Sequence, residues 1–204
     1  MVLIGMLDSP YVRRCAVSMK LMGVPFEHRS VSVFRQFEQF RAINPVVKAP
    51  TLVCDDGSVL MDSTLILDYV ESTVAPAKRL TPANGDRRRD ALRVSGLALA
   101  AAEKCVQMIY EHQQRPADKR HEPWIARVSG QANAAFEELE RSVRPDRWLQ
   151  GDEVTAADVV TACVWRFGQY YRNETAIDAS RYPNLAAHSA RAETLPEFAS
   201  TPLD

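Results

Sequence analysis

The sequence lacks the features that mark several large classes of protein. Lys and Arg number 25 against 26 Asp and Glu, and there is no basic arm or aromatic RNA-binding motif, so nothing indicates a nucleic-acid partner. No apolar run is long enough to span a bilayer. The first residues enter a strand directly, without the charged start, apolar run and cleavage site of a secretion signal. We therefore expect a cytoplasmic protein that binds neither nucleic acid nor membranes.

Cysteine and histidine are equally sparse, with four residues of each type scattered along the chain. No Cys-x-x-Cys pair and no His/Cys ligand spacing occurs, which argues against a metal site. The first cysteine lies inside a predicted helix rather than at its N-terminus, where a thiolate would be stabilised. We predict that all four cysteines are small apolar core residues. They are Cys15, Cys54, Cys105 and Cys163, and the histidines are His28, His112, His121 and His188.

The first third of the chain alternates strand and helix patterns. Residues 2–6 form a short apolar run typical of a buried strand, and Ser9-Pro10 then supplies a helix N-cap with proline at the first helical position. Apolar residues recur along this helix at helical spacing, and Arg13 and Arg14 occupy the remaining, polar positions. Residues 27–33 alternate as a second strand. This order of strand, helix and strand predicts a parallel crossover unit.

The next segment predicts a short helix and then a β-hairpin. Residues 34–43 mix aromatic and polar side chains, and Asn44-Pro45 ends any helix there. Pro50 stands directly before an apolar run; because proline cannot donate a ladder hydrogen bond, it must open that strand or form a special turn. The remaining predicted elements are a strand at 51–54, a hairpin turn at 55–58, a strand at 59–61, and a helix that begins at Asp62-Ser63 with an apolar stripe of Leu65, Ile66, Tyr69 and Val70.

The second half of the chain predicts helices. A linker at 76–85, which contains Pro76 and Pro82, separates it from the first part. A long helix starts at Asp86, and a second runs from about Glu122 to Val143. Thr155-x-x-Asp158 then begins a third helix in the manner of a capping box. We expect the stripe of this third helix to be mostly core: Val159, Ala162, Cys163, Arg166, Phe167 and Tyr170.

This order of elements resembles the cytosolic glutathione transferases, in particular bacterial members with a serine at the start of the first helix. The resemblance spans nearly the whole chain. It implies an α/β thioredoxin-like domain with a four-stranded mixed sheet at 1–75, followed by an all-α helical-bundle domain at 86–204. The motifs that carry it are Ser9-Pro10-Tyr11-Val12-Arg13, Asn44-Pro45-Val46-Val47-Lys48-Ala49-Pro50-Thr51-Leu52, Leu60-Met61-Asp62-Ser63, Ile66-Leu67-Asp68-Tyr69, residues 149–159 and Tyr182-Pro183-Asn184-Leu185.

The resemblance implies that glutathione is the co-substrate and that no metal is needed. If the Ala49-Pro50 bond is cis, Ala49 presents its N–H and C=O to the extended ligand; composition alone favours a trans bond. Ser63 and the helix N-terminus would bind the γ-glutamyl carboxylate and Asp62 the ammonium, or the pair merely caps a helix. Lys48 would lie near the glycyl carboxylate or on the cleft rim, or is a solvated lysine.

Ser9 is the expected catalytic residue. The thiol of glutathione has an ordinary pKa near ~8.5, so most of it is unreactive at neutral pH. A hydroxyl at a helix N-terminus can donate to the sulfur while the helix dipole favours negative charge. In the alternative interpretation Ser9 is only a cap. The electrophile is expected beside Leu7, Tyr11, Phe34, Met108 or Trp165, although these residues suit a core equally well.

The type of residue at the helix start also separates reaction classes. By its resemblance to the serine-containing members of the family, Ser9 implies transfer of glutathione to a small hydrophobic electrophile and argues against disulfide reduction. A glutathione-dependent isomerase or dehalogenase remains an alternative, as does a non-catalytic binding protein of the same fold. The resemblance also implies a homodimer, in which Arg87, Arg88 and Arg89 meet Asp68 or Glu71 of the partner; otherwise this basic run is solvated.

Overall fold

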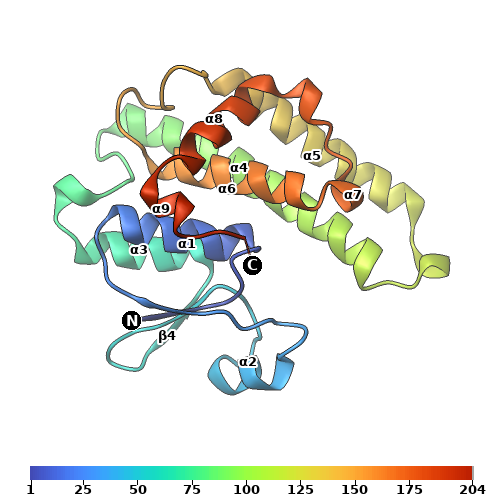
Figure 1. Cartoon of the computed structure of the whole chain (residues 1–204), viewed down its shortest axis with the longest axis horizontal. Coiled ribbons are helices and arrows are strands. Elements are labelled where there is room, and N and C mark those ends of the chain that lie inside the picture. Colours follow the sequence, from blue (N-terminus) through green and yellow to red (C-terminus); the bar gives the residue numbers. More distant parts are fainter. Residues whose placement is uncertain (204) are drawn as a thin grey trace. The chain divides into compact units, whose positions relative to one another are not determined.

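The computed structural model describes residues 1–203, which form two compact units (Figure 1). The first unit contains residues 1–80 together with the chain from Thr194 onward, and the second contains residues 81–193. The units therefore divide inside the predicted linker at 76–85. The predicted helical domain at 86–204 differs at its far end, because the last segment belongs to the first unit. Its final residue, Asp204, lies outside the described residues.

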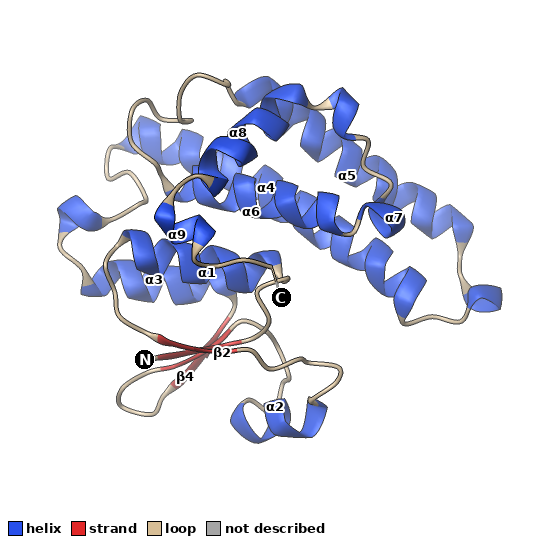
Figure 2. Ribbon diagram, viewed as in Figure 1, coloured by secondary structure: helices blue, strands red, loops and turns tan. Residues whose placement is uncertain are grey.

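The first unit is built on a mixed sheet, drawn in red in Figure 2. Its strand order is β2-β1-β3-β4. The parallel pair is β1–β2, and β3 is antiparallel to both of its neighbours. This confirms the predicted thioredoxin-like sheet. The strands are β1 (Val2–Ile4), β2 (Glu27–Arg29), β3 (Thr51–Val53) and β4 (Val59–Met61).

The second strand is shorter than the predicted 27–33. Ser32 explains the early end, because its hydroxyl accepts the N–H groups of Phe34 and Arg35 at 3.3 and 3.1 Å. The Ser32 N–H in turn donates to the side chain of Gln36. These local bonds turn the chain away from the sheet before the helix α2 (Phe37–Ile43) begins.

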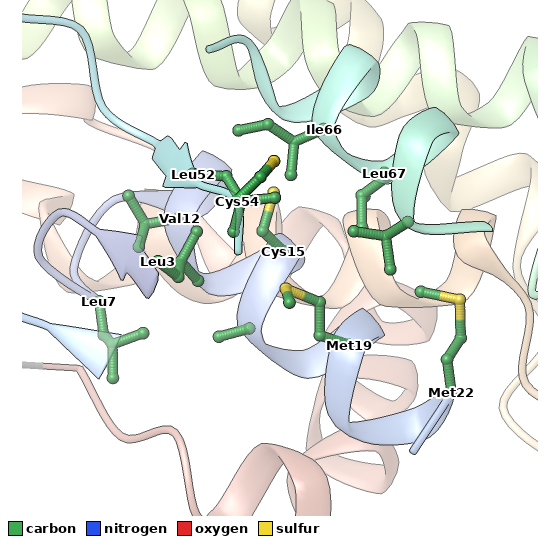
Figure 3. Close-up of a cluster of buried hydrophobic side chains, with 12 residues drawn as sticks. Leu3, Leu7, Val12, Cys15, Met19, Met22, Leu52, Cys54, Ile66 and Leu67 are labelled. Atoms are coloured by element: carbon green, nitrogen blue, oxygen red, sulfur yellow. The ribbon is translucent and has the colours of Figure 1, made fainter. Parts of the chain in front are cut away.

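Helices cover both faces of the sheet (Figure 1). On one face, α1 (Pro10–Leu21) and α3 (Ser63–Thr73) pack over Leu3 and Leu52, which point into the apolar cluster in Figure 3. On the other face, Phe40 of α2 packs with Ile4. Because successive strand residues face opposite sides, β1 contributes Leu3 to one cluster and Ile4 to the other.

Gly5 allows the chain after β1 to run close to the loop that precedes β3. Its φ of +135° lies in a region that other residues rarely adopt. A Cβ atom at this position would lie 2.6 Å from Cγ2 of Val12 and 3.0 Å from Cβ of Ala49. Gly5 therefore permits a close approach between the start of α1 and the Ala49 loop.

The chain from Thr194 onward is held to the first unit by a buried arginine. Arg13 of α1 is 1% exposed. Its Nε donates to the carbonyl of Thr201 at 2.8 Å, and its guanidinium lies 5.5 Å from the ring centre of Phe198 in α9 (Pro196–Ala199). The sequence pattern placed Arg13 on a polar helix face. It is buried because the returning tail covers that face and supplies hydrogen-bond acceptors.

The second unit is helical, as expected. Its central helix, α6 (Ala156–Tyr170), has eleven of its fifteen residues buried, and Thr155 with Asp158 forms the predicted capping box. Small residues line α4 where it is buried, among them Ala98, Ala101 and Ala102. The helices are α4 (Gly85–Gln113), α5 (Glu122–Ser142), α6, α7 (Arg172–Thr175) and α8 (Pro183–Glu193), with short 3-10 turns η2 (Ala117–Lys119) and η3 (Ala179–Arg181); a further turn, η1 (Pro76–Lys78), belongs to the first unit.

Several residues of the predicted apolar stripes are exposed. Leu65 of α3 is 64% exposed and Tyr69 is 39% exposed, whereas Ile66 and Val70 of the predicted stripe are buried, together with Leu67. In α6, Arg166 and Tyr170 face solvent at the edge of an otherwise buried helix. All four cysteines are free and buried, which confirms their prediction as core residues. Among residues 1–203, no helix is long and apolar enough to cross a membrane.

Candidate functional site

The register of the sheet brings the three predicted site segments to one end of the first unit. Ile4, the last residue of β1, pairs with Thr51, the first residue of β3, and Thr51 pairs with Met61, the last residue of β4. The chain that follows β1, the chain that precedes β3 and the chain that follows β4 therefore meet at this end. Those chains carry Ser9, Ala49-Pro50 and Asp62-Ser63.

Ser9 is the N-cap of α1. Its φ and ψ of −68° and 123° are extended, its carbonyl accepts the N–H of Arg13, and its hydroxyl oxygen accepts the N–H of Val12 at 3.4 Å. A hydroxyl has one donor hydrogen and two acceptor lone pairs. Ser9 can therefore keep its capping bond and still donate its hydrogen to an anion at the positive end of the helix.

The loop before β3 is held by two polar side chains that sequence reasoning missed. The Ala49–Pro50 peptide bond is cis. Buried Thr51 donates its hydroxyl to the Lys48 carbonyl at 2.7 Å and accepts the side-chain N–H of buried Asn44 at 2.9 Å. Asn44 also accepts the N–H of Val46. The Asn44-Pro45 pair, noted only as a helix end, was the available signal, because asparagine before proline commonly makes such a turn.

Asp62 and Ser63 begin α3, as predicted. Asp62 is the N-cap with a φ of 73°, and its Oδ1 accepts the N–H of Thr64 at 2.9 Å. Ser63 occupies the first helical position and is almost fully buried. The first N–H groups of a helix have no partner within it, so the backbone here offers donors as well as a positive dipole. The capping role of Asp62 occupies one carboxylate oxygen and leaves the other for a ligand.

Arg14 is a second buried residue that the sequence pattern assigned to a polar face. It is 5% exposed, and its Nη1 donates to the hydroxyl oxygens of Ser63 at 3.1 Å and Thr64 at 3.3 Å. The available signal was its surroundings: Val12, Cys15 and Ala16 leave no wide polar face on this helix. A permanent positive charge thus lies directly behind Ser63.

The other expected site residues of the first unit differ in how exposed they are. Lys48 is exposed and enters no ion pair among residues 1–203. Leu7 belongs to the apolar cluster in Figure 3, Tyr11 is half-buried, and Phe34 is exposed.

The two candidate pocket residues of the helical unit are core residues. Met108 is 1% exposed, and Trp165 is 5% exposed. The Trp165 ring packs edge-on against Phe136 and Tyr182, with ring centres 5.8 Å apart in both pairs. The Trp165 side chain is therefore used by the packing of its own unit. No group of three or more His, Cys, Asp and Glu residues within 1–203 has the arrangement of a metal site.

Comparison with known families decides the family of the chain. The glutathione S-transferase N-terminal domain matches residues 3–78, and the glutathione S-transferase C-terminal domain matches residues 122–191. The chain belongs to the glutathione S-transferase family. All three segments of the candidate site fall within the N-terminal match. The tail that Arg13 holds lies beyond both matched regions.

Relatives of the chain include a GST-like protein, a probable isomerase and a solved glutathione S-transferase. The GST-like protein YibF of Escherichia coli is 28% identical over 80% of this chain and 79% of YibF. A probable maleylacetoacetate isomerase of Vibrio cholerae is 26% identical over 98% of this chain and 94% of the relative. A solved glutathione S-transferase of Methylobacterium radiotolerans, in complex with glutathione sulfonate, is 28% identical with a TM-score of 0.90, over 100% of this chain and 95% of that chain.

Proposed function

We propose that this protein binds glutathione at the end of the first unit's sheet and activates its thiol for attack on a small electrophile. The observation that supports this most directly is the pairing of Ile4 with Thr51 and of Thr51 with Met61, because it gathers Ser9, Ala49 and Ser63. The glutathione sulfonate complex of the Methylobacterium radiotolerans relative supports the choice of ligand. Glutathione is then a co-substrate, and no metal takes part.

The proposed binding mode uses one protein group for each part of the peptide. Ala49 pairs its backbone with the cysteinyl residue, beside Pro50. The hydroxyl and N–H of Ser63 bind the γ-glutamyl carboxylate, and Asp62 binds the ammonium. Lys48, exposed and without an ion pair among residues 1–203, attracts the glycyl carboxylate.

The proposed chemistry begins with the loss of the thiol proton to solvent. The Ser9 hydroxyl donates a hydrogen bond to the resulting thiolate, and the N-terminus of α1 adds its dipole. The sulfur then forms a bond to the electrophilic carbon, whose leaving group departs or whose double-bond electrons shift to an adjacent acceptor. A pKa lowered by two units requires about 2.7 kcal/mol of preferential stabilisation of the thiolate. The half-buried Tyr11, with Leu7 and Phe34, is the proposed neighbour of the electrophile.

A glutathione-dependent isomerase is the second candidate. The relative from Vibrio cholerae, a probable maleylacetoacetate isomerase, aligns with 98% of this chain. In an isomerisation the thiolate adds to a double bond and leaves again after rotation, so glutathione is regenerated. A panel of glutathione-consuming reactions and cis–trans isomerisations, followed by loss of free thiol and by substrate absorbance, separates the two activities. Loss of thiol with product formation supports transfer; product without loss of thiol supports isomerisation.

The role of Ser9 can be tested by the ultraviolet absorbance of the bound thiolate across pH. Ser9→Ala should leave glutathione affinity nearly unchanged while it raises the pKa of the bound thiol and lowers turnover at neutral pH. Ser9→Thr is the matched control, because it keeps the hydroxyl and the cap. Ser9→Cys should shift the protein toward disulfide exchange. If Ser9→Ala keeps the wild-type pH profile, Ser9 is only a cap.

The binding site can be tested separately from the chemistry. Asp62→Ala combined with Ser63→Ala should weaken glutathione binding strongly in calorimetry, with the far-ultraviolet circular dichroism unchanged. Unchanged affinity would show that Asp62 and Ser63 do not bind the γ-glutamyl end of glutathione.

We also propose a cytoplasmic homodimer that serves detoxification. The four free thiols suit a reducing compartment. Within residues 1–203, Arg87 bonds to Gln150 and Arg89 to Asp86 and Asp90, which leaves Arg88 as the arginine proposed to meet Asp68 or Glu71 of a partner. The exposed Leu65 adds an apolar contact. A monomer in sedimentation at micromolar concentration would reject the dimer.

A further inference from the structure

We propose that Arg14 is a positioning residue for the γ-glutamyl carboxylate of glutathione: it holds the Ser63 hydroxyl so that its hydrogen points at the carboxylate, and it places a positive charge behind that hydroxyl. This inference rests on the proposed function, because it assigns a role within the same binding site. The contact between Arg14 and Ser63 links two helices that are far apart in sequence, α1 and α3, which lie side by side in Figure 1.

The first argument is the direction of the hydrogen bonds. A guanidinium is a pure donor, so in the contact with Arg14 the Ser63 oxygen must accept. The donor hydrogen of the Ser63 hydroxyl is then left for another acceptor. A carboxylate ligand at the start of α3 is such an acceptor, and it prefers charge-assisted donors. A serine hydroxyl can both donate and accept hydrogen bonds. The contact with Arg14 uses its oxygen as an acceptor and so orients its hydrogen toward the ligand.

The second argument is that two neighbouring residues of α1 contact the first turn of α3. The Arg14 Nη1 donates to two consecutive residues, Ser63 and Thr64. The neighbouring Cys15 places its Sγ 3.7 Å from the Ser63 carbonyl. The hydroxyl and the backbone of Ser63 are therefore fixed from the same side, with little freedom left when a ligand arrives. Such preorganisation raises affinity because less ordering remains to be done on binding.

The third argument is the sign and burial of the charge. An arginine side chain keeps its proton at all relevant pH values. At 5% exposure its field is screened far less than that of a surface charge. It adds to the positive N-terminal dipole of α3, and both favour an anion at Ser63. Burial of a guanidinium is costly, so a role confined to packing would be served equally well by an apolar side chain.

The test compares two ligands that differ only in the group Arg14 is proposed to recognise. Glutathione is one, and 4-aminobutyryl-cysteinylglycine, which keeps the ammonium and thiol but lacks the γ-glutamyl carboxylate, is the other. Calorimetry on the full-length protein gives the ratio of their affinities. Arg14→Met should weaken glutathione binding by about tenfold, the usual effect of a charge-assisted bond, and leave the analogue unchanged. The affinity ratio should therefore fall by the same factor.

Two further variants separate positioning from folding. Arg13→Met removes the neighbouring buried arginine, which holds the tail, and should leave the affinity ratio as in the wild type. In a Ser63→Ala background, Arg14→Met should weaken glutathione binding by clearly less than in the wild-type background, because the hydroxyl it positions is gone and only the effect of its charge remains. If Arg14→Met does not fold, Arg14→Lys decides: it keeps the charge but not the pair of bonds, so the ratio should fall partway.

The outcomes distinguish this inference from the function on which it rests. If wild-type protein does not bind glutathione, both are wrong. If it binds glutathione but Arg14→Met, or Arg14→Lys in its place, weakens both ligands equally or neither, Arg14 is structural and only the present inference is overturned.

Discussion

Helices α1 and α6 are the central helices of their units, and both bury charged residues. Nine of the twelve residues of α1 are buried, including Arg13 and Arg14, and α6 buries eleven of fifteen, including Asp158. The two helices differ in the location of the hydrogen-bond partners of these buried charged residues. Asp158 accepts the N–H groups of Leu149 and Thr155, both near the start of its own helix. Arg14 donates to the first turn of another helix, at the candidate site.

This comparison teaches that burial of a charge does not by itself indicate function. The carboxylate of Asp158 accepts the two N–H groups and the Thr155 hydroxyl at 2.7 Å, and its Oδ1 lies 3.7 Å from Nε2 of buried His188; all of these groups lie within the helical unit. Arg14 uses an acceptor site of the Ser63 hydroxyl, whose hydrogen we propose is donated to a ligand. Arg13 falls between these two cases. Like Arg14 it bonds to a segment distant in the sequence, but like Asp158 its partners, carbonyl groups of the tail, serve the fold. The following predictions test this distinction, from the largest expected effect to the smallest.

Asp158→Ala should destabilise the helical unit by about 3 kcal/mol, because it leaves several buried donors without an acceptor. Urea unfolding followed by circular dichroism measures the loss. Asp158→Asn keeps one acceptor oxygen at the same position and should lose less. If Asp158 serves only the fold, the glutathione affinity of the folded fraction stays at the wild-type value. A lower affinity of the folded fraction would show that the two helices differ less than we argue.

Arg13→Met should destabilise the first unit by about 2 kcal/mol, because the buried carbonyl of Thr201 loses its donor. Release of the tail should make the chain from Thr194 onward more sensitive to limited proteolysis, identified by mass spectrometry of the fragments. Arg14→Met is the matched variant and should leave the tail protected. Equal cleavage in the two variants would mean that the neighbouring arginines share one role.

Stability should fall as the pH falls below about 6.5, because of His188. Burial lowers the pKa of His188 from its ordinary value of 6.5, an effect that nearby Arg191 reinforces and the charge of Asp158 opposes. Between the lowered pKa and 6.5 the unfolded chain binds more protons than the folded protein. The contribution of neutral His188 to the free energy of unfolding is therefore complete above pH 6.5. It is lost as the pH falls, by at most about 1.4 kcal/mol per pH unit.

Urea unfolding at several pH values between 5 and 8, about the range in which a histidine titrates, measures this slope. His188→Gln should flatten it, whereas His121→Gln, at an exposed histidine, should not. A slope that survives in His188→Gln would assign the titration to another group.

Local sequence signals predicted the positions of the candidate site but not the network behind it. Ser9, Pro50, Asp62 and Ser63 stand at the ends of elements, where caps and prolines have short-range causes that a sequence displays. Asn44 and Thr51 were missed because their bond joins a loop to a strand. Arg14 was missed because a periodic pattern counts charged residues as solvent-facing, whereas this one is buried and contacts the first turn of α3.

Helix faces show the same limit. The pattern in α3 predicted Leu65 as core and did not include Leu67, whereas Leu67 is buried and Leu65 is exposed. Both are leucines on one helix, so composition cannot distinguish them. The direction from which α1 and the sheet approach selects the buried face.

The sequence by itself determined the order of elements, the cap residues and the division into a sheet unit and a helical unit, because these follow from interactions between residues close in the chain. Only the tertiary structure decided that the last segment returns to α1, that Arg13 and Arg14 are buried, and that Trp165 packs in a core. Each of these depends on residues between 17 and 188 positions apart. Contacts at such separations are chosen by how whole helices and strands pack, which no local pattern records.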